Sequence, residues 1–112
     1  MTVRDEKLGE VWAVTPAGRI DSVTSPSFEE AIGRGLAAGE RRVVVDLGGV
    51  EYISSAGLRV LLVAAKRLRD AGGRLVLCRL NEPVRQVFDL AGFLPLFAIE
   101  ASREGALAQA AR

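Results

Sequence analysis

The chain has 112 residues, of which 49% are hydrophobic, so residues 1–112 are expected to form a single domain around one core. Its 15 Lys and Arg residues nearly balance 14 Asp and Glu residues, and the net charge of +1 argues against direct nucleic-acid binding. The absence of histidine and the single cysteine exclude a Ser-His-Asp triad and most metal sites, so we expect no enzyme activity, metal or cofactor.

The N-terminal part of the chain predicts an antiparallel hairpin. Residues 11–15 are rich in β-branched and aromatic side chains and end at Pro16. The weaker alternation of residues 2–7 can pair with them across a turn at 8–9. A lone aromatic such as Trp12 is more typical of packing within a strand than of a ligand surface.

A helix is predicted from Ser25 to about residue 38. Ser25 is the expected N-cap, because a proline follows it in the first turn and apolar side chains recur at helical spacing from Phe28 onward. Gly33 and Gly35 each cost ~1 kcal/mol relative to alanine. The helix therefore depends on tertiary packing, or its glycines allow another element to approach closely.

The middle of the chain predicts a buried strand and an amphipathic helix. Residues 42–47 form a continuous apolar run, typical of a central strand with helices on both faces of its sheet. A helix follows and ends at Gly72 and Gly73, and its basic residues at 66–69 are expected to be solvated. Its apolar face is predicted to contain Leu58, Leu61, Leu62, Ala65 and Leu68.

The last third predicts a strand at 74–78, a helix from Pro83 to Gly92, a short strand at 96–99 and a final helix from Ser102. The cysteine within residues 74–78 is expected in the core. These elements predict an α/β domain with a mixed, mainly parallel sheet of five strands and about four flanking helices.

No apolar run reaches the ~18 residues needed to cross a bilayer. The N-terminus is charged where a secretory signal would be apolar. Both features predict a cytoplasmic protein without membrane insertion.

Two adjacent serines, Ser54 and Ser55, lie at the predicted start of the central helix. A helix N-terminus has unpaired N–H groups and the positive end of a dipole, so either serine could cap the helix, and the same amides would hold a phosphate on it. The local pattern supports a cap and a switch equally.

The same segment half-matches the G-x-S-x-G nucleophile elbow of hydrolases. Ile53 occupies the position of the first glycine, and no histidine is present to act as the base. A hydrolase using Ser54 or Ser55 is therefore the weakest functional hypothesis.

The whole chain resembles the STAS domain of bacterial anti-sigma factor antagonists, through motifs that match in order and spacing. These are Gly18-Arg19-Ile20-Asp21, residues 43–47 followed by residues 52–58, Gly72-Gly73 before a strand, and the segment 83–92. The resemblance runs from the hairpin to the final helix and implies a single STAS domain.

The resemblance implies a protein–protein switch. The unphosphorylated domain of this family binds an anti-sigma factor that is a serine kinase, phosphorylation of one serine breaks the complex, and a serine phosphatase resets it. The phosphoacceptor position falls on Ser55. Many members of the family carry aspartate just before the acceptor, whereas this chain has Ser54 there. Ser54 is the alternative acceptor, because it supplies a second hydroxyl in place of that carboxylate.

Several residues around the serines are expected to meet the partner. They are Asp21, Ser22, Thr24, Ser54, Ser55, Ala56, Gly57 and Arg59. Asp21 is expected either to orient Ser55 or face the partner, or to cap the turn before the first helix. Gly57 is expected to let a partner backbone approach. Arg59 is expected to be an interface residue or phosphate neighbour, or else a plain solvated residue.

The alternative function is a constitutive scaffold. In that case a STAS-like module is a fixed subunit of another complex, in lipid transport or stress signalling, and its serines only cap the helix.

Overall fold

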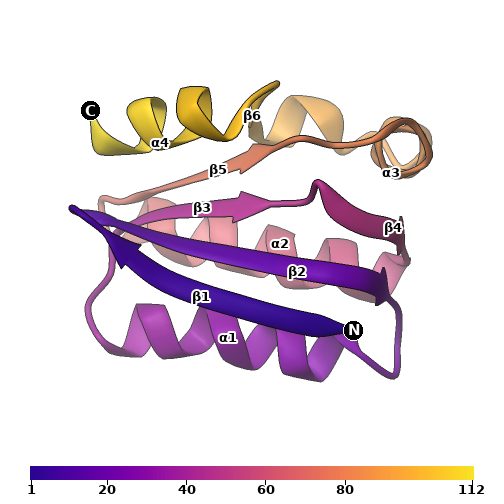
Figure 1. Ribbon diagram of the computed structural model, residues 1–112, viewed down its shortest axis with the longest axis horizontal. Coiled ribbons are helices and arrows are strands. Elements are labelled where there is room, and N and C mark those ends of the chain that lie inside the picture. Colours follow the sequence, from indigo (N-terminus) through magenta and orange to yellow (C-terminus); the bar gives the residue numbers. More distant parts are fainter.

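The computed structural model describes residues 1–112 and shows one mixed sheet with helices on both faces (Figure 1). Its elements are β1 (Thr2–Leu8), β2 (Val11–Ile20), α1 (Ser25–Ala37), β3 (Arg42–Asp46), β4 (Gly49–Ile53), α2 (Ser55–Asp70), β5 (Arg74–Cys78), α3 (Glu82–Leu90), the 3-10 helix η1 (Leu94–Leu96), β6 (Ala98–Glu100) and α4 (Arg103–Ala111). The strand order is β1-β2-β3-β5-β6, with β4 also paired to β2, and only β1 and β2 are antiparallel. The predicted α/β class is confirmed.

β2 continues past the predicted end of the hairpin because two parallel strands pair with it in succession. β3 pairs with residues 12–14 of β2, and β4 pairs with residues 17–20. Pro16 lies between these stretches, where a residue without a backbone N–H interrupts neither parallel ladder. The five predicted strands omit β4, in which the exposed Glu51 and Tyr52 interrupt any continuous apolar run.

β3 is the central strand, as predicted, and separates two apolar clusters. Val43 and Val45 belong to the larger cluster, with side chains of α1, α2 and α3. Val44 belongs to the smaller cluster, with small side chains of α4 on the opposite face. Cys78 is fully buried in the smaller cluster, which confirms its predicted place in the core, and burial raises the pKa of its thiol to about 11.

The first helix differs from the prediction in its cap. The N-cap of α1 is Thr24, one residue before the predicted Ser25. The expected close approach occurs at Gly35, where an added Cβ would collide with the indole of Trp12, whereas the space around Gly33 is open. Trp12 packs against the larger cluster, as predicted for a strand aromatic.

The buried face of α2 differs from the prediction because this helix packs against α1 as well as the sheet. Its buried residues are Gly57, Leu58, Val60, Leu61, Ala64 and Leu68. Leu62, predicted on this face, is 37% exposed and lies beyond its edge. The predicted solvation of the basic cluster is confirmed, since Lys66, Arg67 and Arg69 are exposed.

The C-terminal part follows the predicted order with one shift. The short strand predicted at 96–99 is β6, because η1 occupies Leu94–Leu96. The predicted start of the final helix is confirmed: the Ser102 hydroxyl accepts a hydrogen bond of 2.9 Å from the Gly105 N–H. No helix has the combined length and apolarity needed to cross a membrane.

Candidate functional site

The two serines lie where β4 passes into α2. Ser54 is the N-cap residue, with an extended backbone (φ −92°, ψ 175°), and Ser55 is the first residue of the helix. The Ser54 N–H donates to the Ile20 carbonyl at 2.8 Å. This bond joins the junction to the end of β2, so the serines and the loop after Ile20 lie together at the carboxyl end of two parallel strands.

The two hydroxyls have different surroundings. The Ser54 hydroxyl is buried without a hydrogen-bond partner and makes no cap bond to α2. Of the open alternatives, a side-chain cap by Ser54 is therefore not formed, although Ser54 occupies the N-cap position. Ser55 is exposed, and the first-turn amides of α2 receive no side-chain cap.

Gly57 is a packing residue instead of the predicted partner contact. It is buried, and an added Cβ would lie 2.7 Å from Ile20 Cγ2 and 2.7 Å from Ile53 Cγ1. A glycine is needed here because the helix start presses directly on the ends of β2 and β4. Leu58, beside it, is buried in the larger cluster.

Asp21 caps the turn before α1, which confirms the second of its two predicted roles. Its Oδ1 accepts hydrogen bonds from the Val23 N–H at 3.0 Å and the Thr24 N–H at 3.1 Å. These bonds, led by that from the Thr24 backbone, hold the pKa of Asp21 below its usual value. The Thr24 hydroxyl donates to the Arg19 carbonyl at 2.8 Å, so Thr24 serves the turn, while Ser22 and Val23 remain exposed.

A shallow groove between α1 and α2 runs past Ser55. It is lined by Ser25, Glu29, Ser55, Ala56, Arg59, Val60 and Val63. Arg59 and Ser55 line the same groove, and Val63 adds an apolar surface that is 46% exposed. Seven residues of the predicted partner site thus lie on this groove or on the two segments that lead into α1 and α2, namely Asp21, Ser22, Thr24, Ser54, Ser55, Ala56 and Arg59.

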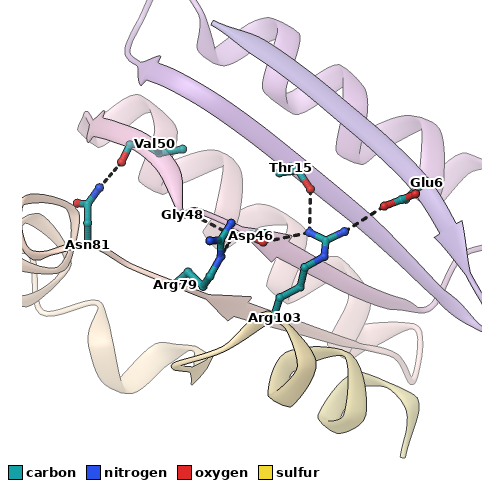
Figure 2. A network of polar contacts seen from close by, with 8 residues as sticks. All are labelled: Glu6, Thr15, Asp46, Gly48, Val50, Arg79, Asn81 and Arg103. Carbon is teal, nitrogen blue, oxygen red and sulfur yellow. Dashed lines mark hydrogen bonds and ion pairs between the residues drawn. The ribbon is translucent and has the colours of Figure 1, made fainter.

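A second polar site, absent from the sequence prediction, lies on the α4 face of the sheet (Figure 2). Asp46, whose side chain is 1% exposed, accepts bonds from Arg79 Nε at 2.9 Å, the Gly48 N–H at 2.9 Å and Arg103 Nη1 at 3.0 Å. Arg103 also donates to Thr15 Oγ1 at 3.1 Å. The only sequence signal is a carboxylate that ends the apolar run of β3.

In this Asp46 cluster, the negative charge of the buried carboxylate is paired with the Arg79 and Arg103 guanidinium groups. Burial alone would raise the pKa of Asp46, but the bonds from Arg79, Gly48 and Arg103 outweigh burial and keep the pKa below its usual value. Arg79 adopts a left-handed backbone (φ 57°), which is uncommon for a residue with a side chain. Arg103 also pairs with Glu6 at 3.1 Å.

Comparison with known proteins places these features in one family. The model of the STAS domain family matches residues 2–106. BtrV of Bordetella bronchiseptica, which is named a candidate anti-sigma factor antagonist, is 50% identical over 81% of this chain and 78% of its own. The anti-sigma-B factor antagonist of Bacillus subtilis is 33% identical over 82% of this chain and 84% of its own. The crystal structure of an anti-sigma factor antagonist from Mycobacterium paratuberculosis, 28% identical, matches with a TM-score of 0.91 over 99% of this chain and 94% of that one.

Proposed function

The chain belongs to the STAS domain family, and we propose that it is an anti-sigma factor antagonist that phosphorylation of Ser55 switches off. The relatives with substantial identity are named anti-sigma factor antagonists, which supports the general role. The exposed Ser55 at an uncapped helix start is the observation that carries the switch.

Ser55 is a better acceptor than Ser54 because a kinase must reach the hydroxyl. Ser55 is exposed, whereas the Ser54 hydroxyl is buried. A phosphate on Ser55 would also meet the free amides of the first turn of α2, which favour an anion. The domain can therefore carry the phosphate without a change of fold.

The proposed partner is an anti-sigma factor that is itself a serine kinase, and a serine phosphatase resets the switch. The partner binds the groove between α1 and α2 and the adjoining loop, in the cytoplasm, where ATP is available. Phosphorylation adds about −1.5 to −2 charges to this surface. At an interface that charge repels acidic groups and must be desolvated, so affinity falls while the fold is retained.

Intact mass measurement of the protein isolated from its own cells tests this function, with and without phosphatase treatment. We expect one phosphate on the wild-type chain and on Ser54→Ala, and none on Ser55→Ala. A phosphate that persists in Ser55→Ala would move the acceptor away from Ser55. Absence of phosphate under all growth conditions would favour the constitutive scaffold.

A further inference from the structure

The groove between α1 and α2 contains two charged side chains, Glu29 on α1 and Arg59 on α2. Neither belongs to any of the salt bridges of the molecule. The groove is therefore close to neutral, and both side chains are free to respond to a third charge. A phosphate on Ser55 would be that charge.

Arg59 follows Ser55 by four residues in α2. Side chains at this spacing lie on the same face of a helix, one turn apart, and the pair is more favourable when the anion is on the N-terminal side. The planar guanidinium also matches phosphate oxygens better than an ammonium group does. Resting on the proposed phosphorylation of Ser55, we propose that Arg59 binds that phosphate and is thereby withdrawn from the anti-sigma factor.

This pairing gives the switch a second component besides repulsion. In the unphosphorylated protein Arg59 is unpaired and lies in the same groove as the exposed Val63. That combination fits a partner segment that presents an acidic side chain beside an apolar one. After phosphorylation the guanidinium is occupied within the chain, and the acidic partner residue faces the phosphate and Glu29 instead.

The other charged groups near the site are already engaged. Asp21, in the loop before α1, accepts the backbone bonds of its turn. Arg19 lies 3.9 Å from Asp21 and over the ring of Tyr52, 4.5 Å from its centroid. Arg59 is thus the groove's free cation and Glu29 its free anion, and they should shift the phosphate pKa in opposite directions.

The test is to incorporate phosphoserine at position 55 of the full chain during translation and to follow the phosphate by ³¹P NMR as a function of pH. Loss of the ion pair in Arg59→Ala should raise the second phosphate pKa by about 0.15–0.4 units, and Arg59→Lys should restore part of the shift. Glu29→Gln should lower it by a smaller amount. Arg67→Ala is the matched control, because Arg67 is exposed on the same helix but does not line the groove.

An unchanged phosphate pKa in Arg59→Ala, or an equal change in Arg67→Ala, would overturn the pairing. This measurement needs neither the kinase nor the partner. Its result is therefore independent of whether Ser55 is phosphorylated in cells, which the mass measurement decides.

The effect on the partner is measured by calorimetric titration of the unphosphorylated chain with the anti-sigma factor from the same genome. Arg59→Ala should weaken binding about tenfold, which corresponds to about 1.4 kcal/mol. Arg67→Ala should leave the affinity unchanged. Equal affinities for wild type and Arg59→Ala would show that the partner does not use this guanidinium.

Discussion

The Asp46 cluster and the Ser54–Ser55 junction both lie at the carboxyl ends of strands, β3 and β4, yet they are built in opposite ways. Both oxygens of the buried Asp46 carboxylate are hydrogen-bonded. At the junction, the Ser54 hydroxyl has no partner and the helix start has no side-chain cap. The polar groups of the first site are paired within the fold, whereas the first-turn amides of the second are unpaired, as the proposed phosphorylation of Ser55 requires.

The hydrogen bonds of the Asp46 cluster, here called the closed site, support this difference from the Ser54–Ser55 junction, here called the open site. Its members come from segments distant in sequence: Glu6 in β1, Thr15 in β2, Asp46 in β3, Arg79 after β5 and Arg103 in α4. Arg103 thus joins the C-terminal helix to β3 through Asp46 and to the hairpin through Thr15 and Glu6 (Figure 2). The open site instead connects neighbouring strand ends through the Ser54 N–H and the Ile20 carbonyl.

Removing the carboxylate of the closed site should have the largest effect on stability. Breaking a buried ion pair costs about 3–5 kcal/mol when the remaining charge stays buried. Because the Arg79 side chain is 50% exposed and that of Arg103 is 26% exposed, both can partly return to water. Asp46→Ala should therefore lower the free energy of unfolding in urea by about 2–3 kcal/mol.

Lowering the pH protonates the Asp46 carboxylate and therefore provides a control for Asp46→Ala. The pKa of Asp46 is lowered by folding, so its contribution to stability is full above its unfolded-state pKa of about 3.9 and is lost as the pH falls below that value. The stability difference between wild type and Asp46→Ala should shrink from pH 6 to pH 3. A difference that stays constant over this range would show that the carboxylate charge does not hold the cluster.

The floor of the open site should be the next most sensitive position. Overpacking costs about 1–3 kcal/mol, and two contacts at 2.7 Å place Gly57 in the upper part of this range; the ~1 kcal/mol that alanine gains over glycine within a helix partly offsets that cost. Gly57→Ala, whose methyl group would press on Ile20 and Ile53, should thus lose about 1–2 kcal/mol. Gly33→Ala is the matched control: the space around it is open, so it should gain about 0.5–1 kcal/mol. A neutral Gly57→Ala would restore the idea that this glycine serves a partner.

A capped helix start provides the third comparison. Asn81 accepts a bond of 3.1 Å from the Val84 N–H at the start of α3 and donates to the Val50 carbonyl. Asn81→Ala should cost about 1–1.5 kcal/mol in thermal or urea unfolding. Ser102→Ala should lose less, because Ser102 accepts a cap bond and makes no second bond. No loss in Asn81→Ala would remove the contrast between capped and uncapped helices.

The fold could be predicted from the sequence wherever the apolar residues of an element form a continuous run or a regular repeat. The continuous run of β3 and the strand Arg74–Cys78 were clear for this reason. β4 is not predicted because its exposed Glu51 and Tyr52 interrupt both the apolar run and the alternation that indicate a strand. Leu62 was misplaced because the position of α1, a tertiary feature, decides which side of α2 is buried.

The Ser54–Ser55 junction and the Asp46 cluster also differ in how far the sequence predicts them. Ser55 and Arg59 are four residues apart in α2, about one helical turn, so spacing alone predicts that they share one face of the helix. Arg79 and Arg103, in contrast, reach Asp46 only through the tertiary arrangement of the sheet and α4, which no local pattern encodes. Even at the Ser54–Ser55 junction, the packing of Gly57 depends on Ile20 at the end of β2, which spacing along α2 does not reveal.

Ser54→Ala should have the smallest effect, and it tests the comparison most directly. An N-cap serine that bonds its helix loses about 1 kcal/mol on replacement by alanine. The Ser54 hydroxyl makes no such bond and is buried without a partner, so its removal should change the free energy of unfolding by less than about 0.5 kcal/mol or increase it slightly. A loss near 1 kcal/mol would mean that Ser54 caps α2 in solution and that its amides are not free for a phosphate. A neutral result would show that the buried Ser54 hydroxyl has no role in stability. The first-turn amides of α2 would then remain available for a phosphate on Ser55.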